Sequence, residues 1–265
     1  SHSPSQLGEG ILARQLSSAD LVHDQLTMDT ADNEDHTFAG IMFDVKARED
    51  SPFEYLQINA VAVRGQLGPI TIWTTPDSHC GKQESQESWS LIHEEVHRRS
   101  FRRCVPMQLE PKIQLRAGQS CGIYVHSKKS GDGQIVYDNL RDRKSRAGGG
   151  DFDQAIKLSH RLLEILPATA HVVNRPFADF DDPHVSRLWG GPWRSRRAFV
   201  GQVHFGVRWL LWNPSSHALL PPAFQDMAWA LSCSRHPRAA ASPLHRLEAD
   251  MLWLILNKVP WWEMA

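Results

Sequence analysis

The stretch SLIHEEVHRRSF contains two histidines and a glutamate at the spacing that a zinc hydrolase uses. His93, Glu94 and His97 form the pattern H-E-x-x-H. On a helix, this pattern places two imidazoles one turn apart around a zinc ion, while the intervening glutamate activates a bound water. The motif therefore indicates metal-dependent hydrolysis only if the segment is helical and a third ligand follows.

The residues around this motif argue against a catalytic zinc. Glu95, Arg98 and Arg99 are charged, whereas the active motif usually sits on a buried helix among uncharged residues. No glutamate stands at the downstream spacing where a third ligand is expected. The alternative is a strand that starts after Trp89, in which the two histidines lie roughly 13 Å apart, too far for one ion. We therefore expect no catalytic residue and no metal ligand in this motif.

A second catalytic look-alike is GQSCG, residues 118–122, which matches the G-x-S-x-G nucleophile elbow. The elbow requires a strand before the serine and a helix after it. Here the following residues, IYVHSKK, are typical of a strand, which favours a hairpin turn. GDG, residues 131–133, lacks the third glycine of a dinucleotide-binding loop, and the sequence has no P-loop. We expect a non-enzymatic protein without a cofactor.

The bulk composition is that of an ordinary globular protein. Over 265 residues the chain has 41% hydrophobic residues, 22% charged residues and a formal net charge of −1. Such a charge gives no overall attraction for nucleic acid. The basic runs at 97–103 and 141–146 fit solvated loops. No apolar stretch is long enough to span a membrane, so we expect protein partners only.

The cysteines indicate an intracellular protein. No C-x-x-C pair occurs, which excludes a zinc ribbon or a thioredoxin motif. The even number of cysteines permits two disulfides. However, the density of cysteines is low for a secreted scaffold, and no N-x-S/T sequon is present. Because the sequence starts at Ser1, an organellar location after loss of a targeting peptide stays open. The four cysteines are Cys80, Cys104, Cys121 and Cys233.

Short segments rich in β-branched and aromatic residues, separated by Gly, Pro, Asp and Ser, indicate a mainly β fold. Their spacing is typical of an antiparallel β-sandwich, not of alternating strands and helices. Residues 1–36 precede them as an acidic, loosely attached arm; residues 1–50 hold ten acidic residues against three basic ones. The segments are 38–47, 53–63, 69–75, 112–117, 120–127 and 133–138.

Two later segments carry different patterns. Residues 151–166 fit a helix or a strand, and we favour a partly helical crossing. Residues 197–212 alternate apolar and polar side chains and form the clearest strand. We place the β-sandwich domain at 37–212 and a helical C-terminal tail at 213–265.

The helical period appears after residue 212. A first helix over 221–233 starts with prolines and has one apolar face, formed by Phe224, Met227, Ala228 and Leu231. A second start signal stands at Ser242 and Pro243. The helix predicted there runs to Pro260, with an apolar face at Leu247, Met251, Leu254 and Ile255.

Tryptophan is concentrated near the C-terminus, where eight of the ten occur from residue 189 onward. Clustered tryptophans either fill a core or face a partner. We expect Trp209, Trp212 and Trp229 in the core. The candidates for partner binding are Trp189, Trp193, Trp253, Trp261 and Trp262.

Residues 38–209 resemble the jelly-roll-like β-sandwich module of PHR domains. The resemblance implies a sandwich that presents its loops to ligands, with a closing strand in residues 189–207, and it places the H-E-x-x-H stretch on a strand. The matching features are Phe43-Asp44, Trp73-Thr74, Trp89, the hairpin-like run from Leu115 to Val125, and Tyr137 to Asn139.

The tail, residues 242–264, is similar to the first part of an F-box. Leu247, Ile255-Leu256 and Val259-Pro260-Trp261 match F-box positions, whereas Glu248 stands in place of a proline. This similarity implies a Skp-type adaptor as partner.

We therefore expect a non-enzymatic protein-interaction or structural subunit of a larger complex, built on a β-sandwich with a Trp-rich helical docking tail. Three alternatives stay open: an F-box-type ubiquitin-ligase substrate receptor, a zinc metalloprotease acting through His93, Glu94 and His97, and a glycan-binding sandwich.

Overall fold

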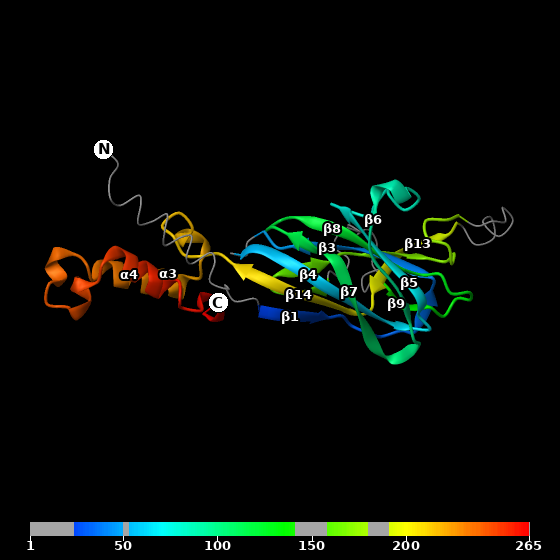
Figure 1. The fold of residues 1–265 in the computed structure, drawn as a ribbon, viewed down its shortest axis with the longest axis horizontal. Coiled ribbons are helices and arrows are strands. Elements are labelled where there is room, and N and C mark those ends of the chain that lie inside the picture. Colours follow the sequence, from blue (N-terminus) through cyan, green and yellow to red (C-terminus); the bar gives the residue numbers. More distant parts are fainter. Residues whose placement is uncertain (1–23, 50–52, 141–157, 180–190, 265) are drawn as a thin grey trace, which may run out of the picture. The chain divides into compact units, whose positions relative to one another are not determined.

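The computed structural model describes residues 24–49, 53–140, 158–179 and 191–264, and in them the chain is mainly β (Figure 1). Two sheets account for the strands, and their strand pairs are antiparallel wherever the register is defined. The predictions of a mainly β chain and of antiparallel pairing are thus confirmed.

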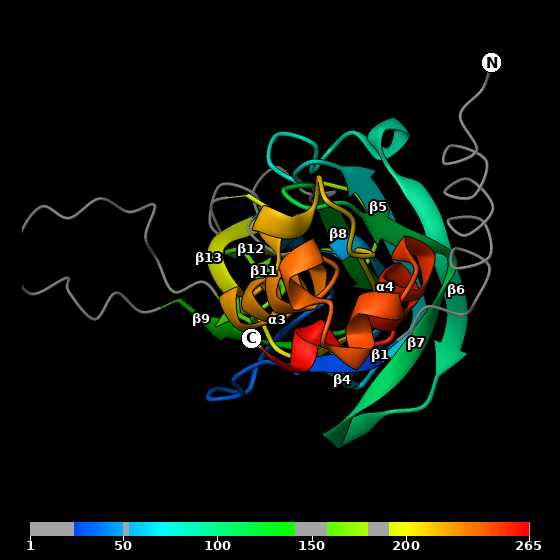
Figure 2. The ribbon, with the colours of Figure 1, turned by 90° about the vertical axis from the view of Figure 1, so that its left-hand side faces the viewer.

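The larger sheet has ten strands. Eight follow one another in the order β2-β9-β13-β12-β3-β8-β5-β6, while β11 also pairs with β3 and β10 pairs with β11. Strand β6 therefore forms one edge of this sheet (Figure 2). The strands are β2 His36–Phe38, β3 Gly40–Ala47, β5 Gly68–Pro76, β6 Ser90–His97, β8 Ser120–Ser127, β9 Ile135–Asn139, β10 Leu158–Ser159, β11 Leu163–Ile165, β12 Ala168–His171 and β13 Trp193–Phe199.

The smaller sheet has four strands in the order β1-β14-β4-β7. They are β1 Asp24–Asp29, β14 Gln202–Trp209, β4 Phe53–Gly65 and β7 Ser100–Leu115. The long strand β7 continues from β6, so the chain passes here from the edge of one sheet to the edge of the other.

Both sheets contribute large apolar side chains that are fully buried. The period of two along a strand explains the pattern, because alternate residues point to the same face. In β14 the buried residues include Val203, Phe205, Val207 and Trp209. Strand β3 is buried along nearly its whole length, which leaves Met42 and Asp44 inside as well as the alternating Ile41, Phe43 and Val45.

The strand predicted over 197–212 is divided between the two sheets. Its alternation is correct, since Phe199 and Val203 are fully buried. However, the chain leaves β13 after Phe199 and enters β14 of the other sheet at Gln202. A Cβ on Gly201 would lie 2.2 Å from the carbonyl oxygen of Ala62, so only glycine fits at this change of sheet.

The helical crossing expected over residues 151–166 is wrong for the part that the structure describes. Leu158–Ser159 and Leu163–Ile165 are strands, and the second pairs with β3. A short apolar run fits either period, and here the pairing with β3 decides the outcome. The GQSCG stretch does form a turn between strands, but β7 and β8 lie in different sheets and do not form a hairpin.

The acidic N-terminal segment differs from the expected loose arm in its second part. Residues 24–29 are a strand, and the following acids bind a buried arginine. Arg64 is 8% exposed and donates to both carboxylate oxygens of Asp32, to Asp35 and to the carbonyl of Phe101. These hydrogen bonds, above all that to Asp32, raise the pKa of Arg64 although burial opposes the rise.

The C-terminal segment contains the two α-helices of the described residues, and they lie side by side (Figure 2). Helix α3, Pro222–Cys233, starts at prolines as predicted and buries Phe224 and Ala228. The second predicted helix is interrupted, and only α4, Ala249–Leu256, is α-helical. Neither helix is long and apolar enough to cross a membrane. Short 3-10 turns flank the two helices at His217–Leu219, Pro237–Ala239, Pro243–Arg246 and Trp261–Glu263.

The predicted apolar face of the second helix is also corrected. The chain is extended at Leu247 and Glu248, because the 3-10 turn capped by Ser242 ends there and α4 starts anew. Because α4 starts anew after this break, its residues do not continue the helical period predicted from Leu247. The buried residues of α4 are Leu252 and Leu256, and not the predicted ones.

The chain divides into two compact units. In the described residues, one unit comprises 25–49 and 55–206. The other, which we call the C-terminal unit, comprises 24, 53–54 and 207–264. The boundary falls within β1, β4 and β14.

Candidate functional site

The H-E-x-x-H segment lies on a strand, as predicted, and this strand, β6, is an edge of the larger sheet. Its histidine side chains do not point apart. His93, Glu95 and His97 share one face of β6, and their ligand atoms all lie within 4.8 Å of one another. In the pairing of β6 with β5, His93 lies opposite Ile72 and Leu91 lies opposite Trp73, so the register shifts by one residue between them. This shift determines which residues of β6 share the face of His93.

The two histidine rings stack with their centroids 5.2 Å apart, and their Nε2 atoms are 2.9 Å apart. The expectation that a strand keeps them too far apart for one ion is therefore wrong. The expected 13 Å describes the backbone, whereas each side chain carries its Nε2 several ångströms from its Cα and leans along the strand.

Hydrogen bonds fix the tautomer of His93. Its Nδ1 lies 2.8 Å from the carbonyl oxygen of Gln108 on β7, and a carbonyl only accepts, so Nδ1 carries the proton. The Nε2 of His93 is then an acceptor that faces His97. Burial lowers the pKa of His97 and the nearby His93 lowers it further, against the opposing charge of Glu95. Both effects favour neutral imidazole, the form that binds metals.

Glu94 lies on the opposite face of the strand. Its carboxylate forms an ion pair with Lys128, with Oε1 and Nζ 2.8 Å apart. In a zinc protease this residue has to face the metal that the two histidines hold. The position next to the histidines belongs instead to Glu95, whose Oε2 is 3.9 Å from the Nε2 of His97.

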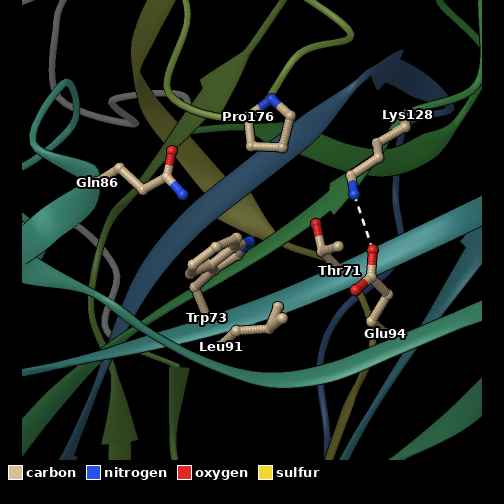
Figure 3. Close-up of a pocket in the computed structure, with 7 residues that line it drawn as sticks. All are labelled: Thr71, Trp73, Gln86, Leu91, Glu94, Lys128 and Pro176. Atoms are coloured by element: carbon tan, nitrogen blue, oxygen red, sulfur yellow. Dashed lines mark hydrogen bonds and ion pairs between the residues drawn. The ribbon is translucent and has the colours of Figure 1, made fainter.

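A cavity of about 300 Å³ opens on the face of the large sheet that carries Glu94. Figure 3 shows the indole of Trp73 beside Leu91, with the ion pair of Lys128 and Glu94 across the cavity. The cavity thus combines an aromatic surface with charged and amide groups. Its lining residues are Thr71, Trp73, Gln86, Leu91, Glu94, Lys128 and Pro176.

The wall of this cavity rests on a buried aromatic cluster. Tyr124, Trp89, Phe177 and Met42 pack together, with Trp73 and Trp193 against them. The indole N–H of Trp89 donates to the carbonyl of Lys82. This cluster holds the segment around Pro176 over the sheet.

Two buried histidines tie the same segment to the sheet. His171 accepts a hydrogen bond from the hydroxyl of Tyr124 at 2.6 Å and donates to the carbonyl of Ala178 at 2.9 Å. His126 lies 2.9 Å from the carbonyl of Val173. Burial lowers the pKa of His171 to about 4 and that of His126 to about 3, so both are neutral at pH 7.

A second group of possible metal ligands is a network of polar side chains that already have hydrogen-bond partners. The ligand atoms of Asp44, His79 and Cys80 lie within 4.8 Å of one another. However, Asp44 already accepts hydrogen bonds from the hydroxyl of Ser78 and from the backbone N–H of His79, and His79 uses its ring nitrogens on Asp44 and Thr169. Burial raises the pKa of Asp44, but these bonds and the charge of His79 together lower it. The group anchors the loop after β5 to β3.

Three of the five predicted partner-binding tryptophans pack within the C-terminal unit. Trp261 is 3% exposed and donates to the carbonyl of Leu210. The ring of Trp262 stacks on Trp209, and Trp253 lies edge-on to Trp212. These contacts make them part of the unit's own packing.

The other two candidates for partner binding are Trp193 and Trp189, and the residues predicted for the core include Trp209 and Trp229. Trp193 stacks on His171 with centroids 3.9 Å apart, and Trp189 lies outside the described residues. Trp209 is buried as predicted. The core assignment of Trp229 is wrong, because this residue on α3 is 69% exposed. A helix has one buried face, and Phe224 and Ala228 define it on the other side of α3.

Exposed apolar side chains gather on the C-terminal unit. Of the ten large hydrophobic residues exposed in the described chain, seven fall between residues 219 and 264. On α4 they are Met251, Leu254 and Ile255, which share one face. We call these three residues the α4 apolar face.

Sequence reasoning missed Glu95, Lys128 and Gln108 as members of these sites. Their roles depend on strand register and on pairing between distant segments, which local patterns do not encode.

No family model, curated protein or solved structure matches this chain. The four cysteines are free.

Proposed function

We propose that the chain is a non-enzymatic interaction protein, whose C-terminal unit docks on an apolar surface of another protein. In this proposal the β part is a jelly-roll-like sandwich that serves as the rigid support. The observation that carries the proposal is the α4 apolar face. Met251, Leu254 and Ile255 are 47%, 36% and 37% exposed.

The chemistry of this face selects a protein partner. The stretch from Met251 to Leu256 contains no charged residue, so a polar ligand gains nothing from it. Exposed apolar residues at helical spacing are what a hydrophobic groove of a partner protein recognises. The exposed indole of Trp229 on α3 adds the residue type most enriched at binding hot spots.

Support for the sandwich comes from the path of the chain. Successive strands change sheets at the steps from β6 to β7, β7 to β8 and β13 to β14. Both sheets bury large side chains, for example Phe43 in one and Phe205 in the other. Two antiparallel sheets with facing apolar sides are the arrangement of a sandwich.

The test places charges on the α4 apolar face. Affinity purification of the full chain from its native cells is compared by quantitative mass spectrometry with the double variant Met251→Glu/Ile255→Glu. We expect recovery of the partner protein to fall at least about tenfold, because the interface has to desolvate two carboxylates. Ala249→Glu is the matched control, since it adds a charge to the exposed start of the same helix. Equal recovery by all three proteins would refute the proposal.

An F-box-type substrate receptor is the more specific form of this proposal. The α4 apolar face lies within the segment that is similar to an F-box, and Ile255 is one of its matching positions. Binding of the purified full chain to a purified Skp-type adaptor tests this form alone. Absence of binding there, with a partner still lost in the double variant, would favour a different apolar partner.

A second candidate function is binding of a glycan in the cavity beside Trp73. The observation that favours it is the combination of an indole with Gln86 and the ion pair of Lys128 and Glu94. A glycan array with the wild-type chain tests it. Lys128→Ala is expected to lose the signal and Lys129→Ala, outside the lining, to keep it.

Zinc-dependent proteolysis is the least supported alternative. Its general base would have to be Glu94, which is directed toward Lys128 on the opposite face from His93 and His97. The carboxylate that does lie beside the two histidines is Glu95, which is not the glutamate of the H-E-x-x-H mechanism.

A further inference from the structure

We propose that His93, Glu95 and His97 form a binding site for a zinc-type divalent cation at the edge of the larger sheet. The inference is independent of the proposed docking function, because the site lies on β6. It differs from the sequence motif in its third member, which is Glu95 and not Glu94. The three side chains project from one strand face with their ligand atoms within 4.8 Å of one another.

The first argument is that His93 is already oriented as a metal ligand. Its Nδ1–H donates to the carbonyl oxygen of Gln108 at 2.8 Å. Histidines that bind metals through one nitrogen usually donate the other N–H to a carbonyl or a carboxylate, which fixes the ring. The lone pair on Nε2 of His93 is thereby directed toward His97.

The second argument is the separation of the donor atoms. The two Nε2 atoms are 2.9 Å apart. Two imidazoles on a tetrahedral zinc, with Zn–N distances of about 2.0–2.1 Å, have their nitrogens roughly 3.3 Å apart. The ion replaces the proton shared between these two atoms, so His97 has to carry its proton on Nδ1, and the two Nε2 atoms have to separate by a few tenths of an ångström. The side chain of Glu95 is 69% exposed and its Oε2 already lies 3.9 Å from the Nε2 of His97, so it is placed to supply the third ligand.

The donor set decides the class of cation. Two imidazoles and one carboxylate suit Zn²⁺ and its first-row neighbours, whereas Ca²⁺ and Mg²⁺ prefer sites made of oxygen. Arg98 and Arg99 follow the site directly and oppose a cation. Both are exposed, so water and salt screen their charges.

The position of the site indicates a structural or regulatory ion. Strand β6 is the edge of its sheet, and His93 connects it to β7. An ion held by residues at the middle and the end of β6 would brace this edge, which otherwise offers backbone groups to other chains. The chain supplies three ligands here, so water or a partner's side chain would have to supply the fourth.

The experiment measures binding of Zn²⁺ to the purified, metal-free full chain by isothermal titration calorimetry. The absorption spectrum of the Co²⁺ form reports the ligand geometry. We expect one ion per chain, with affinity at least about tenfold weaker in Glu95→Gln and weaker still in His93→Gln and His97→Gln. Glu94→Gln is the matched control, because it changes the same group one residue away on the opposite face, and we expect it to bind as the wild type does.

Three results would overturn the inference. They are the absence of stoichiometric binding, unchanged affinity in His93→Gln, and a loss in Glu94→Gln as large as in Glu95→Gln. Because the side chain of Glu95 is exposed, its variant folds and keeps the test valid even if a histidine variant does not. The thermal midpoint provides a second readout, since Zn²⁺ should raise it in the wild type and not in His97→Gln.

Discussion

At the residue scale, the buried polar groups of this chain serve mainly to hold loops on the larger sheet. Asp44 fixes the loop after β5, and His171 and His126 fix the segment around Pro176. The cavity beside Trp73 depends on the segment that His171 and His126 fix, because Pro176 in this segment lines the cavity. A buried polar group with all its partners specifies one arrangement, whereas the loss of one partner is costly.

Replacing Asp44 by alanine is expected to lower the free energy of unfolding by about 3–5 kcal/mol. The change leaves Ser78 and His79 without the carboxylate that accepts from them in a buried position. Chemical denaturation measures the loss. Glu49→Ala removes an exposed carboxylate that pairs with Lys46, and it should cost less than about 1 kcal/mol. Equal losses in both variants would contradict this role of Asp44.

His171 is expected to make the protein less stable as the pH falls. Its pKa is about 4 in the folded chain and 6.5 when exposed, so the unfolded chain binds the proton more readily. Stability is therefore complete above pH 6.5 and is lost as the pH falls toward 4, by roughly 3 kcal/mol. Denaturation at pH 7, 5 and 4 should show a smaller decrease for His171→Gln than for the wild type. Identical decreases would disprove the assignment.

At the element scale, the sequence predicts most strands of the two sheets and both the start and the buried face of α3. These features are local, since they depend on alternation or helical period within one segment. Three other features depend on pairing with distant strands. They are the strands formed within residues 151–166, the break between β13 and β14, and the orientation of His93 toward His97. A single segment cannot encode them, and for this reason the metal-ligand geometry was not predicted.

The segment around Asp32 was expected to be a loosely attached acidic arm, but its carboxylates form hydrogen bonds with the buried Arg64. Replacing Arg64 by lysine is expected to cost roughly 2–3 kcal/mol, because lysine cannot reproduce the paired bonds of the guanidinium to Asp32. Hydrogen exchange of residues 30–35 should become faster, since Asp32 and Asp35 lose their anchor. Unchanged exchange in this peptide would show that the segment is held by other contacts.

At the scale of the whole molecule, the chain combines a β-rich unit that buries its apolar residues with a C-terminal unit that leaves many exposed. Three of the five tryptophans predicted to bind a partner, Trp253, Trp261 and Trp262, contact other residues of the C-terminal unit. The exposed apolar residues of this unit include the α4 apolar face, Met251, Leu254 and Ile255, and also Trp229 on α3. The central claim is that another protein covers the α4 apolar face.

Cross-linking mass spectrometry in native cells tests this claim most directly. Lys258 follows α4 one turn after Leu254, and its exposed amine is a suitable attachment point for an amine-reactive cross-linker. We predict cross-links from Lys258 to one partner protein in the wild type and in Ala249→Glu, and their loss in Met251→Glu/Ile255→Glu. If Lys258 forms no cross-links to another protein, or if the charged variant forms the same ones, the claim is contradicted.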